Sequence, residues 1–313
     1  MRESWAVNLR AKGLSFRWIR HQPRKPAKTA MKLDPCGIVV LLNDHHLHEL
    51  TEHLLQVGGH GRGKDERVWL GLSTEAVVNS PFPDSEKKTR DCAKLCHLVA
   101  HFDLLADQLI RQEGAEALFQ HQYVDHLTFR SRVSYQNKKA KFFWSGKLPW
   151  GNVPGEYSRR KQIFQRMCGH VGWEWREAGK PDMPVEKIVR ELDSYQGLIN
   201  LPSNCPGYTA GFFERMAMGA VVLQYRSGTP LPEGLEPGRH FLEYDPDRPE
   251  ELVARLEEVL KDPGQFSRMA SEGQRACLAR HTLQHRLQAI FRRLHTLQPT
   301  PWLESLVEKL EKH

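Results

Sequence analysis

Residue types suited to binding a phosphate-containing ligand are concentrated between Gly207 and Gly219. A helical pattern over Phe212–Met218 follows Gly207 and Gly211, where the missing Cβ atom lets the backbone approach a ligand closely. The first N–H groups of a helix lack internal partners and, with the positive end of the helix dipole, attract phosphate. Glu214 is expected in the first turn, where a carboxylate can accept hydrogen bonds from two neighbouring hydroxyl groups. The alternative is an ordinary glutamate that the helix dipole favours. The residues expected to contact the ligand are Tyr208, Thr209, Ala210, Gly211 and Glu214.

The elements that would position these residues alternate between strands and helices. In the N-terminal half, Gly37–Leu42 is an apolar, largely β-branched run, typical of a strand buried on both faces. A helix is expected at 103–112. Further strands are expected at Val68–Leu72, Cys96–Ala100 and Leu118–Phe119. This alternation predicts a parallel sheet covered by helices on both faces.

The start of the chain does not fit a Rossmann-like domain, which usually opens with a strand. The pattern over Ser4–Lys12 is helical, and the strand candidate Leu14–Ile19 follows it. Either this domain lacks its first strand or further chain precedes Met1.

A second unit begins near Ala140, as expected for a chain of 313 residues, which exceeds what one hydrophobic core usually organises. Its expected strands are Lys141–Trp144, Leu198–Leu201, Ala220–Gln224 and His240–Tyr244. Its expected helices begin near Ser158 and cover Phe212–Met218, Pro249–Leu260, 264–280, 282–295 and 300–312. We therefore expect an α/β protein with two domains.

Three stretches of the second unit share their order and spacing with a known family. They are Leu198-Ile-Asn-Leu-Pro, Gly207-Tyr-Thr-Ala-Gly-Phe-Phe-Glu214-Arg-Met-Ala-Met-Gly219 and Glu236-Pro-Gly-Arg-His-Phe-Leu-Glu-Tyr. They resemble the C-terminal domain of GT-B glycosyltransferases, in the group-one subset that includes spore-maturation-type enzymes. His101-Phe-Asp and Val124-Asp125 with Phe129 match more loosely. The resemblance covers about 70–313 and is strongest after 195.

This resemblance implies two Rossmann-like domains facing a cleft. Residues 1–139 would form the acceptor-side domain, with a basic segment at 1–30, and 140–298 would bind a nucleotide-diphosphate-sugar donor. A helix at 299–313 would cross back to the first domain. Glu214 would be the carboxylate that binds the ribose of the donor. The nucleotide-sugar is a co-substrate, so no cofactor is expected.

The resemblance also assigns a role to basic residues before the donor motif. Ser145-Gly146-Lys147 and Arg159-Arg160-Lys161 stand where the family has its glycine-containing first loop and its phosphate-binding cations. Fixed cations stabilise a leaving diphosphate as its charge develops. A solvated basic helix start is the alternative, although cations there oppose the helix dipole. The residues expected to contact phosphate are Gly146, Lys147, Arg159 and Arg160, with the two arginines favoured over Lys161.

Two positions depart from the family pattern. Retaining members carry a second glutamate eight residues before the ribose glutamate, where this chain has Pro206. Close relatives often have arginine three residues before that glutamate, where this chain has Gly211. Tyr208 or Thr209 could replace the first glutamate in contacting the sugar. A retaining outcome is favoured by analogy alone.

Candidates for catalysis on the acceptor side are His101, at the end of an expected strand, and Glu75. His101 could contact the sugar or the acceptor, and Glu75 could act as a base or contact the acceptor. For both residues a purely structural role is the alternative. The cluster Asp44, His45, His46, His48 and His53 shows no known ligand pattern, so no metal is expected.

The net charge of +7 comes from residues 1–30, which hold eight lysines and arginines against Glu3 alone. A basic face over the whole molecule is therefore not indicated, although this segment could touch phosphate, an anionic membrane surface or a charged acceptor. No apolar run has the length of a transmembrane helix, and the first residues lack the apolar core of an export signal. We expect a cytoplasmic protein with free, mostly buried cysteines.

Three function classes remain open from the sequence. The first is a metal-independent glycosyltransferase, hexosyltransferase-like, with an unidentified glycan, protein, lipid-linked or nucleic-acid acceptor. The second is a GT-B shell that has lost catalysis and binds a nucleotide or a glycan. The third is a glycosyltransferase acting on nucleic-acid bases, for which binding would depend steeply on salt.

Overall fold

The computed structural model describes residues 38–43, 51, 55–56, 61–63, 67–73, 84–148, 156–177, 184–203 and 207–311. The chain divides into two compact units, which are described one at a time. Unit 1 comprises residues 1–120 and 286–313, and unit 2 comprises residues 121–285.

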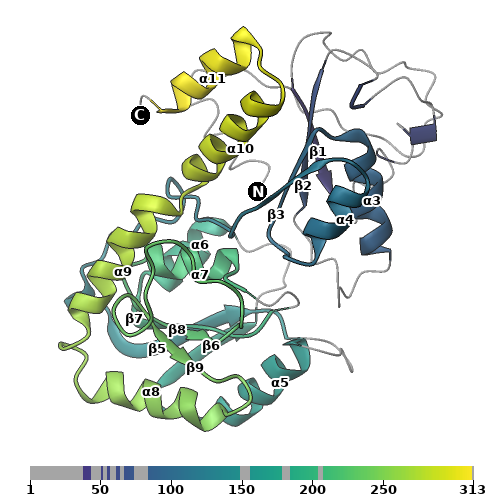
Figure 1. Cartoon of the computed structure of the whole chain (residues 1–313). Helices are drawn as coiled ribbons and strands as arrows, with labels where there is room; N and C mark the ends of the chain where they lie inside the picture. The colour runs from purple at the N-terminus through teal and green to yellow at the C-terminus, as the bar shows by residue number, and fades with distance from the viewer. Residues whose placement is uncertain are drawn as a thin grey trace. The chain divides into compact units, whose positions relative to one another are not determined.

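Unit 1 contains a parallel sheet in the order β1-β2-β3-β4 (Figure 1). Its described strands are β1 (Ile38–Asn43), β2 (Val68–Ser73), β3 (Leu98–His101) and β4 (Glu116–Phe119). Its described helices are α3 (Ser85–Leu95), α4 (Ala106–Gln112), α11 (Pro301–Glu311) and most of α10 (Leu283–Leu297). Trp69 and Val99 of the sheet pack against Ala93 of α3 and Ile110 of α4. Helices α3 and α4 thus cover apolar residues of β2 and β3.

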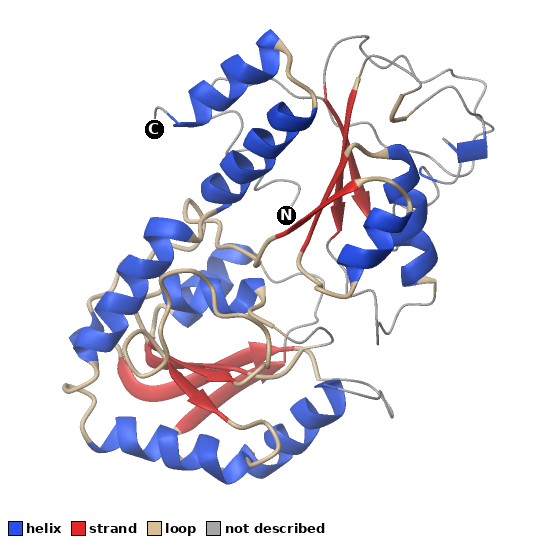
Figure 2. Ribbon diagram, viewed as in Figure 1, coloured by secondary structure: helices blue, strands red, loops and turns tan. Residues whose placement is uncertain are grey.

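Unit 2 is built on a second parallel sheet, in the order β6-β5-β7-β8-β9 (Figure 2). Its strands are β5 (Lys139–Gly146), β6 (Trp173–Glu177), β7 (Tyr195–Asn200), β8 (Val221–Tyr225) and β9 (Leu242–Tyr244). Its described helices are η1 (Tyr135–Asn137), α5 (Glu156–Met167), α6 (Val185–Leu192), α7 (Ala210–Ala217), α8 (Pro249–Lys261) and α9 (Ser267–Arg280).

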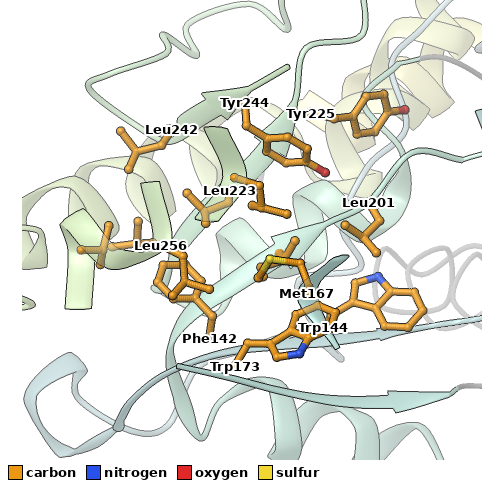
Figure 3. Close-up of a cluster of buried hydrophobic side chains, with 14 of the residues drawn as sticks. Phe142, Trp144, Met167, Trp173, Leu201, Leu223, Tyr225, Leu242, Tyr244 and Leu256 are labelled. Carbon is orange, nitrogen blue, oxygen red and sulfur yellow. The ribbon is translucent and has the colours of Figure 1, made fainter. Parts of the chain in front are cut away.

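The alternation of side chains along β5 supplies both faces of the unit 2 core, because successive residues of a strand point to opposite sides. Phe142 and Trp144 join the cluster between the sheet and helices α5 and α8, together with Met167 and Leu256 (Figure 3). Phe143 joins the cluster on the other face, under α6, α7 and α9. Both faces of the sheet are therefore buried, so polar groups can face a ligand at the ends of its strands.

The predicted α/β class with two parallel, helix-covered sheets is confirmed. All strands expected at 37–42, 68–72, 96–100, 118–119, 141–144, 198–201, 220–224 and 240–244 are present with shifts of a few residues. The helix and strand expected at 4–12 and 14–19 lie outside the described residues. The sequence prediction missed β6 and α6. In β6, charged residues alternate with tryptophans at the edge of the sheet, so no continuous apolar run marks the strand.

The units change at 120/121 and 285/286, whereas the sequence suggested boundaries at 139/140 and 298/299. Residues after 120 join unit 2 partly through Val124, which pairs with Thr282 in an isolated bridge and donates its N–H to the His281 carbonyl at 2.9 Å. Residues after 285 join unit 1, where Arg293 Nη2 of α10 contacts Glu116 Oε1 of β4 at 2.6 Å. These contacts link segments far apart in sequence, so local patterns do not reveal them.

Candidate functional site

The order of the strands in the unit 2 sheet draws attention to the carboxyl ends of two of them, β5 and β7. The chain passes from β5 outward to β6 and then crosses to β7 on the other side of β5. Such a reversal of direction is a topological switch point, and open α/β sheets bind ligands there, outside the carboxyl ends of the strands. Gly146 ends β5 and Asn200 ends β7, so these residues flank the switch point.

The turn into helix α7 follows β7 at these same strand ends. Gly207 has a φ of +139°, a conformation that favours glycine, and its N–H and carbonyl both bond to the Tyr225 hydroxyl at 3.2 and 2.9 Å. Thr209 is the residue before α7 and makes no side-chain capping bond. Ala210 is the first helical residue. The uncapped first turn can therefore offer backbone N–H groups to an anion.

Glu214 lies one residue beyond the first turn of α7, because the helix begins at Ala210 instead of Phe212. The expectation of a first-turn glutamate was therefore wrong. Thr209 ends the preceding extended segment and lets the helix start two residues earlier. Since dipole effects fall off within the first turn, the dipole does not explain a glutamate at this place.

The carboxylate of Glu214 has no hydrogen-bond or ion-pair partner within the described part of the chain. The residue is half-buried. Desolvation raises the pKa of this carboxyl group above its ordinary value, although the neighbouring Arg215 charge opposes the rise. An unpaired, partly desolvated carboxylate is available to accept hydrogen bonds from a ligand.

Arg215 is a site residue that the sequence reading missed. Only 6% of it is exposed, and its guanidinium donates from Nη1 to the Gly211 carbonyl at 2.7 Å and from Nη2 to the Ser145 carbonyl at 2.8 Å. Burial lowers the pKa of Arg215 to about 10, so the group stays charged at neutral pH. Its position three residues after Phe212, on the apolar face of α7, is the signal that could have revealed a buried cation.

Arg160 of α5 makes a second connection at the switch point. Its Nη1 donates to the Lys147 carbonyl at 2.9 Å, and its Nε donates to the Pro202 carbonyl. The loops that follow β5 and β7 are thus joined by one guanidinium. Arg159, in contrast, pairs with Asp247 at 2.9 Å. The two arginines that the sequence treated as equivalent therefore make different contacts.

Among the expected ligand contacts, Tyr208 lies in the packed interior and Gly146 is half-buried. Tyr208 is 4% exposed, packs edge-on against Phe212 and Phe241, and donates its hydroxyl to Glu243 at 3.3 Å. Gly146 lies against Trp144, whose ring would be 2.6 Å from a Cβ atom at Gly146. Tyr208 and Gly146 therefore support the carboxyl ends of the strands by packing.

We use the name switch-point site for the group that these contacts assemble. It comprises Gly146, Lys147, Arg160, Asn200, Gly207, Thr209, Ala210, Gly211, Glu214 and Arg215. The site combines a helix start, two arginines bound to carbonyls and one carboxylate.

The catalytic candidates belong to unit 1. His101 is the last residue of β3, and its ring is fully buried against Phe119. Its Nδ1 donates to the Asp103 carbonyl at 2.9 Å, while Nε2 lies 3.5 Å from Asp107 Oδ1. Desolvation lowers the pKa of His101, which favours the neutral ring at pH 7. Glu75 lies outside the described residues.

Over the described ranges, no group of three or more histidine, cysteine, aspartate or glutamate residues is arranged to hold a metal ion. The histidine cluster at 44–53 falls almost entirely outside those ranges, as do the basic residues of the N-terminal segment. Cys92, Cys96 and Cys277 are free and buried as expected, whereas Cys168 is exposed. None of the described helices has the length and apolar character needed to cross a membrane.

Solved structures with a similar fold are GT-B glycosyltransferases, so the chain has the GT-B α/β fold. Sucrose-phosphate synthase from Thermosynechococcus elongatus superposes with a TM-score of 0.55 at 12% identity, covering 84% of this chain and 74% of that one. The α,α-trehalose 6-phosphate synthase of Burkholderia multivorans gives 0.54 at 10% identity, covering 85% and 71%. Anabaena HepE in complex with UDP and glucose gives 0.53 at 12% identity, covering 88% and 78%.

The sequence itself matches one family model. Residues 156–292 match the family described as Glycosyl transferase-like. This stretch begins at α5 and ends within α10, so it includes Arg160, Glu214 and Arg215 of the switch-point site. No curated protein sequence matches significantly. Residues 156–292 are thus similar to a glycosyl transferase-like family, and the chain has a GT-B fold.

Proposed function

We propose that the protein is a glycosyltransferase that takes a sugar from a nucleotide-diphosphate-sugar bound at the switch-point site. The observation that carries this proposal is the unpaired carboxylate of Glu214 beside an uncapped helix start and a buried arginine. A nucleotide diphosphate presents the complementary groups, which are a ribose diol and a pair of phosphates. The glycosyl transferase-like match over 156–292 supports the same activity.

In this proposal each part of the site has a separate role. Glu214 accepts hydrogen bonds from the ribose hydroxyls, and charge-assisted bonds of this kind are stronger than neutral ones. The backbone at Thr209, Ala210 and Gly211 donates to the diphosphate, as helix starts do. Arg160 and Lys147 add positive charge where the leaving diphosphate gains negative charge.

Several finer features belong to the proposal. UDP is the first nucleotide to test, because HepE was solved with UDP and glucose. We propose a hexosyl donor, a retaining outcome and no divalent cation in the reaction, with the acceptor unidentified. Glu75 stays the candidate for contacting the acceptor, because the ring of His101 is fully buried. Membership of the spore-maturation-type subset and a cytoplasmic location stay predictions of the sequence.

Calorimetric titration with UDP, GDP and ADP tests the donor site in wild type and in Glu214→Gln. Loss of charge-assisted bonds to two hydroxyls weakens the affinity for the preferred nucleotide by about 10- to 100-fold. Glu250→Gln is the matched control, because Glu250 is an exposed glutamate at the start of another helix of the same unit, α8. Equal affinities in wild type and Glu214→Gln would refute the ribose role.

A catalytically inactive nucleotide-binding shell is the second candidate, and Pro206 at the place of the family's second glutamate favours it. Slow hydrolysis of a nucleotide-sugar separates the two, because a transferase lacking its acceptor usually transfers some sugar to water. Release of the nucleotide diphosphate from one sugar donor, lost in Glu214→Gln and unaffected by EDTA, supports the transferase. Tight nucleotide binding without any release supports the binding shell.

A further inference from the structure

Like Arg160, Arg215 donates to carbonyl groups at two distant points of the chain, but Arg215 is buried whereas Arg160 is half-buried. Nη2 of Arg215 reaches the Ser145 carbonyl near the end of β5, and Nη1 reaches the Gly211 carbonyl in the first turn of α7. One rigid, planar group therefore holds the end of a strand to the start of a helix.

The charge of Arg215 is not neutralised by a carboxylate in the part of the chain that the structure describes. Its Nε is buried and has no hydrogen-bond partner there. The charge of Glu214 acts on it favourably, the charge of Arg160 unfavourably, and desolvation outweighs both. A buried cation without an ion-pair partner is unfavourable in the free protein, and an anion bound nearby would relieve that cost.

Gly211 is matched to this arginine. A Cβ atom at position 211 would lie 2.4 Å from Nη1 of Arg215, while the next nearest atoms are 3.6 Å away. The guanidinium therefore occupies the space that a side chain at 211 would need. Position 211 keeps a glycine because of one contact, which makes Gly211→Ala a way to displace the guanidinium without removing its charge.

We propose that Arg215 is a positioning residue for ligand phosphate: it joins the end of β5 to the first turn of α7, and its buried charge is neutralised by the phosphates bound at that turn. This inference rests on the proposed function for the identity of the ligand as a nucleoside diphosphate. The inference adds Arg215 to the site as a residue that does not itself need to contact the ligand. Its effect should be confined to the phosphate part, because the ribose is assigned to Glu214.

The test is calorimetric titration of wild type, Arg215→Met and Arg255→Met with UDP, uridine and pyrophosphate. Arg215→Met removes the charge and keeps the length of the side chain. We expect it to weaken UDP and pyrophosphate binding about tenfold or more and to leave the weak binding of uridine unchanged. Arg255, an exposed arginine of α8 paired with Glu258, serves as the control and should change nothing.

Two further variants keep the test decisive if Arg215→Met does not fold. Arg215→Lys keeps the charge but cannot hold both carbonyls in one plane, and we expect UDP affinity between those of wild type and Arg215→Met. Gly211→Ala displaces the guanidinium and, as alanine favours a helix, should fold and bind UDP more weakly than wild type. Wild-type UDP affinity in both variants would overturn the proposal.

The outcomes separate this inference from the proposed function. Equal weakening of UDP and uridine in Arg215→Met would show a merely structural role and overturn the inference, while nucleotide binding itself would stand. If wild type binds pyrophosphate but no nucleoside diphosphate, and Arg215→Met loses pyrophosphate, the phosphate role is supported and the donor assignment fails. If wild type binds none of the three, both proposals are overturned.

Discussion

Replacing Glu214 by glutamine is predicted to stabilise the free protein while it weakens nucleotide binding. In the free protein the carboxylate is half-buried and has no partner among the described residues. Its pKa is raised by desolvation, so the ionised form is disfavoured in the folded state. Glutamine keeps the shape of the side chain and removes that charge.

The size of this effect follows from the burial of the side chain. A buried polar group without a partner costs about 1–3 kcal/mol, and partial exposure places Glu214 near the lower end, at about 1 kcal/mol. For a unit of this size, 1 kcal/mol corresponds to a rise in Tm of about 2–4 °C. Residues near active sites often trade stability for function in this way.

The pH dependence gives the sign of the effect. Below the unfolded-state pKa of glutamate, about 4.3, the carboxyl is protonated in both states, so wild type and Glu214→Gln have equal stability. As pH rises through the raised folded-state pKa, wild type loses stability relative to the variant. The difference in Tm is therefore expected to be near zero at pH 4 and about 2–4 °C at pH 8.

The assay is thermal unfolding by circular dichroism of wild type, Glu214→Gln and Glu250→Gln between pH 4 and 8. Glu250 is a first-turn glutamate that the dipole of α8 favours, so its replacement should slightly lower Tm at pH 8. A lower Tm for Glu214→Gln at pH 8 would show that the carboxylate is paired in the free protein. The assignment of Glu214 as an available ligand group would then be wrong.

Three other predictions concern the framework of unit 2. Lys138→Met breaks a fully buried 2.7 Å pair with Asp193 and should cost about 3–5 kcal/mol; urea unfolding checks this, and a much milder effect argues against burial of the pair. Gly273→Ala should lower Tm although alanine favours a helix, because its Cβ atom would lie 2.3 Å from the His240 carbonyl; a higher Tm in a thermal scan contradicts that packing. Tyr225→Phe removes both bonds that hold the turn before α7 and should weaken UDP binding about tenfold with a loss of stability of about 1 kcal/mol; unchanged affinity in calorimetry means that the turn needs no such support.

Much of the fold could be predicted because its signals are local. The apolar runs of β2, β7 and β8 mark strands buried on both faces, and the amphipathic spacing of α8 marks a surface helix. Helix α3 gives only a weak signal, because it is mostly polar and buries small side chains such as Thr89 and Ala93, which give no apolar period. Local patterns fail where burial involves small or polar residues.

The sequence by itself determined that a glycine-containing turn leads from β7 into a helix with a glutamate near its start, and that basic residues precede it. Only the tertiary structure decided which arginine reaches the switch point: Arg160 contacts both loops there, whereas Arg159 pairs with Asp247. It also decided that Arg215 is buried, because its partner Ser145 lies 70 residues earlier in the chain. Residue type and spacing are local properties, but desolvation and hydrogen-bond partners depend on segments that only folding brings together.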